Sequence, residues 1–135
     1  MDKRKPGSLT LRLAGAYNML WGASVIFFPF LFFDLSGLPR PFYPEIWQCV
    51  GMIVGVCGLG YWLAAENPVE HWIIVLVGML GKIFGPIGFL KAIYDGVFNT
   101  KMAIVIVFND IIWWIPFGLI LMEVYRRKQD GKAKS

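Results

Sequence analysis

Two charged residues, Lys82 and Asp110, lie near the middle of long apolar stretches, where a charge is unexpected. A charged side chain at the centre of a membrane helix costs about 2.5 to 3.5 kcal/mol on insertion scales. An amine and a carboxylate at such positions either neutralise each other as an ion pair or act on a small ligand or a proton. Any chemistry in this chain is therefore expected from these two residues and their polar neighbours.

Lys82 and Asp110 are expected at similar depths in a membrane. Lys82 lies about 15 Å along its helix from one side, and Asp110 lies about 18 Å from the same side of a 30 Å core. Asn18 has a comparable depth, and Asn109 directly precedes Asp110. The sequence thus predicts an intramembrane polar cluster of Lys82, Asp110, Asn109 and Asn18. Because successive helical residues point about 100° apart, only one of Asn109 and Asp110 is expected to face the centre.

Large aromatic residues are expected around this cluster. Trp113 and Trp114 follow Asp110 by about one helical turn, and Trp21 and Phe84 lie near the same level. We regard these four residues as candidates for lining a pocket. The indole N–H of Trp114 or Trp21 is expected to donate a hydrogen bond to the carboxylate.

Two interpretations of the polar cluster remain open. In the first, a buried Lys82–Asp110 pair fixes the register of two helices and has a structural role. In the second, the cluster forms a pocket at the membrane midplane that binds or moves a small ligand or a proton. Pro86 and Pro116 lie near the cluster in sequence and are expected to bend their helices there.

The elements that must position these residues are four apolar stretches of membrane-spanning length. The chain has 135 residues, of which 57% are hydrophobic and 16% charged, whereas soluble domains are about 25% charged. A helix of about 20 apolar residues crosses a bilayer core. We therefore predict an all-α membrane protein, a single four-transmembrane-helix bundle over residues 1–135, with spans at 13–33, 46–65, 72–90 and 102–122.

The distribution of basic residues predicts the topology of this bundle. Nine Lys and Arg residues precede the first span or follow the last, and three lie in the connections that would face the opposite side. Because cytoplasmic segments accumulate Lys and Arg, both termini are expected in the cytoplasm. The net charge of +4 comes from these end clusters, so we expect a lipid bilayer and no nucleic acid as partner.

Small residues recur at helical spacing in the apolar stretches, as is typical of closely packed membrane helices. This pattern predicts tight packing within the bundle, and one glycine face also allows a homodimer. The residues concerned are Gly15, Gly22, Gly51, Gly55, Gly58, Gly78, Gly81, Gly85 and Gly88.

Other signals of catalysis or metal binding are weak. Cys49 and Cys57 are eight residues apart, about 12 Å along a helix and beyond disulfide reach; they are expected to be buried and structural. The only histidine, His71, lies beside Glu66 and Glu70 at a membrane boundary, which is a poor metal site. The sequence predicts no catalytic residues, no metal and no cofactor, and it leans against an enzyme.

The first apolar stretch, Leu11-Arg12-Leu13-Ala14-Gly15 to Trp21-Gly22, resembles the start of DoxX-like proteins, which are small bacterial four-helix membrane proteins. The chain is more similar still to a group of uncharacterised small bacterial four-helix integral membrane proteins. They share segments like Trp47–Gly51, Gly81–Pro86 and Asn109–Trp114. The resemblance implies the bacterial inner (plasma) membrane. Because DoxX-like proteins are associated with redox partners, it also implies an accessory role beside another membrane protein.

Function is therefore expected to fall into one of two main classes. The first is an accessory or scaffold component of a membrane system, linked to redox chemistry and bound to a membrane-protein partner. The alternative is a small-molecule or proton-coupled binder or transporter that uses Lys82 and Asp110. A membrane enzyme ranks third, because only these same two residues could supply acid–base chemistry.

Overall fold

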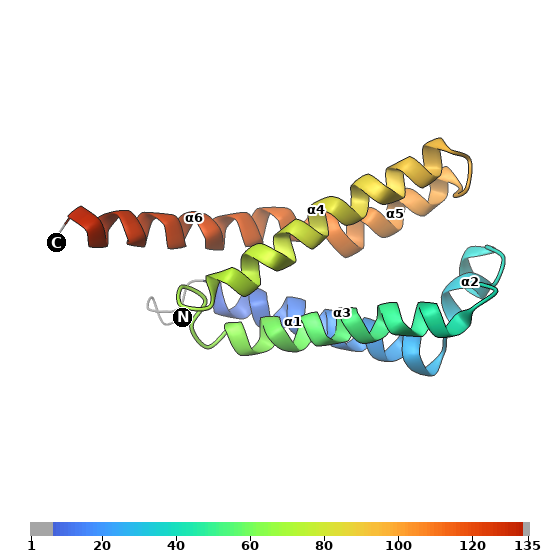
Figure 1. The fold of residues 1–135 in the computed structure, drawn as a ribbon, viewed down its shortest axis with the longest axis horizontal. Coiled ribbons are helices and arrows are strands. Elements are labelled where there is room, and N and C mark those ends of the chain that lie inside the picture. Colours follow the sequence, from blue (N-terminus) through green and yellow to red (C-terminus); the bar gives the residue numbers. More distant parts are fainter. Residues whose placement is uncertain (1–6, 134–135) are drawn as a thin grey trace. The chain divides into compact units, whose positions relative to one another are not determined.

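The computed structural model describes residues 7–133, and every regular element in that range is a helix (Figure 1). Three helical stretches are long and apolar enough to cross a membrane: Pro44–Ala64, Trp72–Tyr94 and Ala103–Gly131. The protein is thus an all-helical membrane protein. The helices are α1 (Ser8–Phe27), α2 (Leu31–Ser36), α3 (Pro44–Ala64), α4 (Trp72–Tyr94), η1 (Thr100–Met102), α5 (Ala103–Ile106), η2 (Val107–Ile111) and α6 (Ile112–Ala133).

The chain forms two compact units, and each is described by itself. The N-terminal unit comprises residues Leu11–Leu63 and contains most of α1 together with α2 and α3. The C-terminal unit comprises residues Ala64–Ser135 and the first ten residues of the chain, and it contains α4, α5, η2 and α6.

In the N-terminal unit, α1 and α3 lie side by side (Figure 1) and their backbones are in contact at glycines. A Cβ atom added to Gly15 would lie 2.7 Å from the carbonyl oxygen of Gly58, and one added to Gly22 would lie 2.9 Å from the nitrogen of Gly55. No side chain larger than hydrogen fits there without a shift. Glycine spacing in these two helices therefore serves packing within the chain.

The first predicted span, residues 13–33, is divided between two helices. Helix α1 ends at Phe27 and the short α2 begins at Leu31. Pro29 lacks a backbone N–H and disfavours helical geometry in the residue before it, so a continuous helix is interrupted here. Gly37, with a positive φ of 71°, then ends α2. A charged residue, Arg12, and a polar one, Asn18, lower the hydropathy of α1, which is not among the three apolar stretches named above.

A charged pair holds the segment that follows α2. The Arg40 guanidinium donates two hydrogen bonds to the Asp34 carboxylate, each of 2.8 Å, and it also lies 4.6 Å from the centre of the Phe30 ring. This hydrogen-bonded guanidinium lowers the pKa of Asp34 below its ordinary value. The bidentate geometry fixes the chain direction between α2 and α3.

In the C-terminal unit, α4 runs beside the stretch formed by α5, η2 and α6 (Figure 1). The predicted fourth span is not one regular α-helix, because residues Val107–Ile111 form a π-helical turn. Within it the Ile112 N–H bonds to the carbonyl of Val107, five residues earlier. Val75 of α4 and Phe117 of α6 are completely buried. The start of α1 joins this unit through the Ser8 hydroxyl, which donates to the Ala65 carbonyl at 2.6 Å.

Candidate functional site in the C-terminal unit

Lys82, near the middle of α4, is 5% exposed and is held by groups from η2 and α6. Its ammonium donates a hydrogen bond of 2.9 Å to the backbone carbonyl of Asn109. The nearer Asp110 carboxylate oxygen lies 3.9 Å from the same nitrogen, and the Trp113 ring centre lies at 5.8 Å. The lysine therefore has an ionic partner, but its hydrogen bond goes to the backbone next to that partner.

The π-helical turn explains how a backbone carbonyl can serve this lysine. In a regular α-helix each interior carbonyl accepts from the N–H four residues later. The wider turn at Val107–Ile111 departs from this register, and Asn109 lies within it. Such single-turn π-bulges are frequent at functional sites. Both neighbours thus contribute to the site, Asn109 through its backbone carbonyl and Asp110 through its side chain.

A second hydrogen bond runs in the opposite direction, from α6 to α4. The Trp114 indole N–H donates to the backbone carbonyl of Lys82 at 2.8 Å. This carbonyl would normally accept from residue 86, but Pro86 has no N–H to give. Trp114 therefore replaces the hydrogen bond that Pro86 removes. We expected this indole to donate to a carboxylate, and that expectation was wrong.

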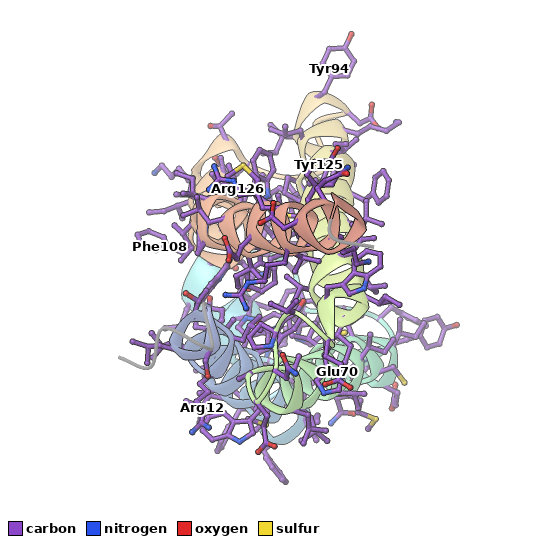
Figure 2. The ribbon with its side chains drawn as sticks, turned by 90° about the vertical axis from the view of Figure 1, so that its left-hand side faces the viewer. Arg12, Glu70, Tyr94, Phe108, Tyr125 and Arg126 are labelled. Carbon is purple, nitrogen blue, oxygen red and sulfur yellow. The ribbon has the colours of Figure 1, made fainter. Side chains whose placement is uncertain are left out.

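The Asp110 carboxylate lies against α4 at Gly85. A Cβ atom added to Gly85 would lie 3.7 Å from an Asp110 carboxylate oxygen, in ordinary van der Waals contact. The Asp110 side chain keeps 17% of its surface exposed. In the same π turn Phe108 points away from the helices (Figure 2) and is 59% exposed. The turn thus places the Asn109 carbonyl and the Asp110 carboxylate at α4 and directs an apolar side chain outward.

The other predicted site residues lie elsewhere. Phe84 is on α4 but is 64% exposed, because two residues along a helix turn it away from Lys82. Asn18 and Trp21 belong to the N-terminal unit. Asn18 is buried, and a Cβ atom added to Gly58 would lie 2.9 Å from the Asn18 Cβ. Trp21 lines a cavity of about 190 Å³ within that unit.

Cys49 and Cys57 do not contribute to this site. Both are free thiols and both are exposed. Our expectation that they are buried was wrong, because their face of α3 is not the glycine face that packs on α1. Among residues 7–133, no group of three or more His, Cys, Asp and Glu residues is placed to hold a metal ion.

The arrangement is an intramembrane clamp between α4 and the η2–α6 stretch. Its parts are the Lys82 ammonium, the Asn109 carbonyl, the Asp110 carboxylate and the Trp114 indole, and we call these four residues the polar clamp. Chemically it can neutralise charge, fix register, or exchange a proton between amine and carboxylate. Comparisons with protein families, with curated proteins and with solved structures give no match for this chain. Function is therefore argued from these residues and their geometry.

Proposed function

We propose that this chain is an accessory or scaffold component of a membrane system in the bacterial inner membrane, linked to redox chemistry. The proposal includes four spans with both termini in the cytoplasm. Helix α1 has 20 residues, about 30 Å at 1.5 Å per residue, which is enough to cross a bilayer core. The basic residues at the two ends of the sequence support this orientation.

One observation carries the proposal: the polar clamp joins two helices in both directions. Lys82 donates to the Asn109 carbonyl, and Trp114 donates to the Lys82 carbonyl. Two reciprocal side-chain to backbone bonds hold the helices at one register, which is what a rigid scaffold requires. Meanwhile large apolar side chains such as Phe84 and Phe108 face outward and offer surface to lipid or to a membrane-protein partner. The redox link rests on the resemblance to DoxX-like proteins.

The test combines partner capture with the clamp variants. A tagged full-length chain is cross-linked in intact cells with a membrane-permeant reagent, and each captured protein is quantified against an untagged strain. For a scaffold, Lys82→Met should lose folded protein and partner together, and Lys82→Met with Asp110→Leu should recover both. A double variant that folds normally but no longer binds its partner would contradict the scaffold role. It would show that the charges of the polar clamp are themselves needed for function.

A small-molecule or proton-coupled binder is the second candidate, because of one feature of the clamp. The Asp110 oxygen lies 3.9 Å from the Lys82 ammonium, longer than a hydrogen bond, and its side chain is partly exposed. A carboxylate held this loosely can take up a proton or a cationic ligand. Purified protein in liposomes that contain a pH-sensitive dye tests this idea. Proton flux lost in Asp110→Asn but kept in Glu123→Gln would favour it, and no flux above empty liposomes would remove it.

A further inference from the structure

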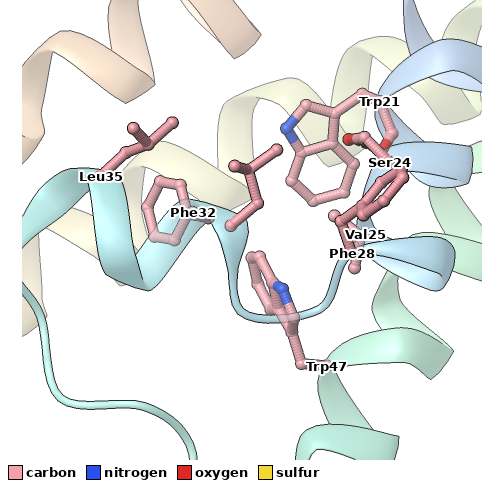
Figure 3. A pocket seen from close by; sticks show the side chains of 8 residues that line it. Trp21, Ser24, Val25, Phe28, Phe32, Leu35 and Trp47 are labelled. Carbon is pink, nitrogen blue, oxygen red and sulfur yellow. Dashed lines mark hydrogen bonds between the residues drawn. The ribbon is translucent and has the colours of Figure 1, made fainter.

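A half-open cavity of about 190 Å³ lies within the N-terminal unit, where α1 ends, α2 lies and α3 begins (Figure 3). An engineered apolar cavity of about 150 Å³ binds benzene. The space is therefore large enough for a short run of hydrocarbon. Its walls come from three helices and the segment that follows α1: Trp21 and Ser24 from α1, Phe28 just after it, Leu31 and Leu35 from α2, and Trp47 from α3.

The lining of this cavity is almost entirely apolar and favours a hydrocarbon group. Ser24 carries the one hydroxyl in the lining, and it is already donated to the Trp21 carbonyl at 2.7 Å. The Trp47 indole N–H is buried and has no hydrogen-bond partner among the described residues, and the Trp47 ring packs edge-on against Trp21 with ring centres 5.6 Å apart. The rest of the lining is mostly ring and hydrocarbon surface, so a largely apolar ligand fits and a strongly polar one would lose hydrogen bonds on entry.

The surroundings of the cavity identify the source of that hydrocarbon. Its rim is continuous with exposed apolar side chains, since Phe28 is 64% and Leu35 is 81% exposed. Helix α3, which supplies Trp47, is one of the stretches able to cross a membrane, and the cavity lies at the end of α3 where that stretch begins. The charged Asp34–Arg40 pair lies on and just after α2. Apolar walls next to a charged pair are typical of the boundary between lipid chains and headgroups.

We propose that this cavity binds one acyl chain of a bilayer phospholipid, entering near the headgroup boundary. The acyl chain would pack against the indole of Trp21 and the side chains of Phe28 and Leu31. This contact is specific, unlike the non-specific contact of lipid with the outer face of α3. The site is independent of the polar clamp and of the scaffold proposal.

Photo-cross-linking with a defined lipid tests the proposal. Full-length protein is reconstituted in phosphatidylcholine–phosphatidylglycerol vesicles that contain a phosphatidylcholine with a diazirine on its acyl chain. Labelled residues are then mapped by mass spectrometry. We expect labelling of cavity residues at least about fivefold above that of lipid-facing residues of α3 such as Ile53 and Val56, which are both exposed. Ser24→Leu fills the cavity and should remove this excess without changing the labelling of Ile53.

Matched variants make the result decisive. Ala23→Leu adds the same bulk one position away in α1, outside the cavity lining, and should leave the excess unchanged. Leu31→Trp fills the cavity from α2 and should also remove the excess labelling, so it replaces Ser24→Leu if that variant does not fold. Equal labelling of cavity and outer faces would mean annular lipid only. Unlabelled cavity residues would mean that this chain or a second copy of it fills the space. Either of these two outcomes overturns the proposal.

Discussion

The two units hold their helices together by different means. In the N-terminal unit, α1 and α3 meet backbone to backbone at Gly15 and Gly58. In the C-terminal unit, α4 is joined to η2 and α6 by hydrogen bonds from Lys82 and Trp114 to backbone carbonyls. Lipid offers no hydrophobic force between apolar helices, so membrane proteins rely on close packing and on hydrogen bonds. The N-terminal unit adds to its glycine contact a hydrogen bond between α3 and α1, from the Gln48 side-chain amide to the Ile26 carbonyl at 2.8 Å.

The difference also separates the kinds of change that each unit tolerates. A contact made by glycine is sensitive to volume and indifferent to charge, whereas a polar contact is sensitive to charge and to the removal of one partner. Polar groups that are costly inside a membrane also offer chemistry that glycine cannot. The candidate site therefore lies in the C-terminal unit.

The largest effect is expected from breaking the ion pair of the polar clamp. Lys82→Met alone or Asp110→Leu alone leaves a buried charge unpaired, which costs about 3 kcal/mol or more. The double variant removes both charges and should recover most of the loss. Unfolding in mixed detergent micelles, followed by circular dichroism, measures all three. If the single variants are as stable as the parent, the Lys82 ammonium and the Asp110 carboxylate, 3.9 Å apart, do not stabilise the protein by pairing.

A somewhat smaller effect is expected from adding volume to the glycine contact. In Gly58→Ala the new methyl group would lie 2.7 Å from the Gly15 carbonyl oxygen and 2.8 Å from the Met19 nitrogen. Backbone atoms cannot rotate away, so the helices must separate, at about 1 to 3 kcal/mol. The same unfolding measurement applies.

Gly55→Ala is the matched control in the same helix. An added Cβ there meets nothing within 4 Å, and alanine is the better helix former by up to about 1 kcal/mol. Its stability should equal or exceed that of the parent. If Gly58→Ala and Gly55→Ala behave alike, close packing of α1 on α3 does not stabilise the N-terminal unit.

The comparison can be sharpened within the polar clamp by a double-mutant cycle on Trp114 and Pro86. Trp114→Phe leaves the Lys82 carbonyl without its indole donor and should cost about 1 to 2 kcal/mol. In a Pro86→Ala background the new N–H at residue 86 can bond the same carbonyl. Trp114→Phe should then cost less, with a coupling of about 0.5 kcal/mol or more. If Trp114→Phe costs the same free energy of unfolding in the parent and in the Pro86→Ala background, the indole hydrogen bond does not stabilise the protein and Trp114 acts only through ring packing.

The beginnings of α3 and α4 could be predicted from composition, but the continuation of α6 to Ala133, past the predicted 122, could not, and neither could every interruption of the helices. Helix α4 begins at Trp72, as its apolar stretch does, and α3 begins two residues before the predicted 46. The break at Phe28–Pro29 follows from proline chemistry, which the long apolar stretch outweighed in our prediction. No residue type in Val107–Ile111 marks a π turn, because that register depends on packing against α4.

The candidate site was predictable in its charges and not in its hydrogen bonds. The two intramembrane charges, Lys82 and Asp110, are visible in any hydropathy reading. The Asn109 carbonyl becomes a partner through the π turn, which the sequence does not specify. The free carbonyl of Lys82 does follow from Pro86 four residues later, since proline removes that donor. The spacing of four residues between Lys82 and Pro86 could therefore have identified the Lys82 carbonyl as the acceptor for the Trp114 indole.

The smallest expected effect lies outside both helix contacts, at the Asp34–Arg40 pair. The hydrogen-bonded guanidinium of Arg40 lowers the pKa of Asp34 below its ordinary value of 3.8. A group whose pKa is lower in the folded protein stabilises above its unfolded pKa, and this contribution is lost as the pH falls through the folded pKa. We therefore expect the protection factors of the α2 amides, which correct for the pH dependence of intrinsic exchange, to stay unchanged between neutral pH and about pH 5 and to fall below about pH 4.

Substitution of Arg40 separates this pair from general acid effects. Arg40→Lys keeps the charge but cannot make two parallel hydrogen bonds to one carboxylate. Its α2 amides should exchange faster than those of the parent at neutral pH and should respond less to acid. Both side chains of the pair lie on the surface, 59% and 48% exposed, so the change should stay local and leave the exchange of α3 and α4 unaltered. A loss of protection that spreads into α3 on acidification would show that Asp34 and Arg40 support the packing of the whole N-terminal unit.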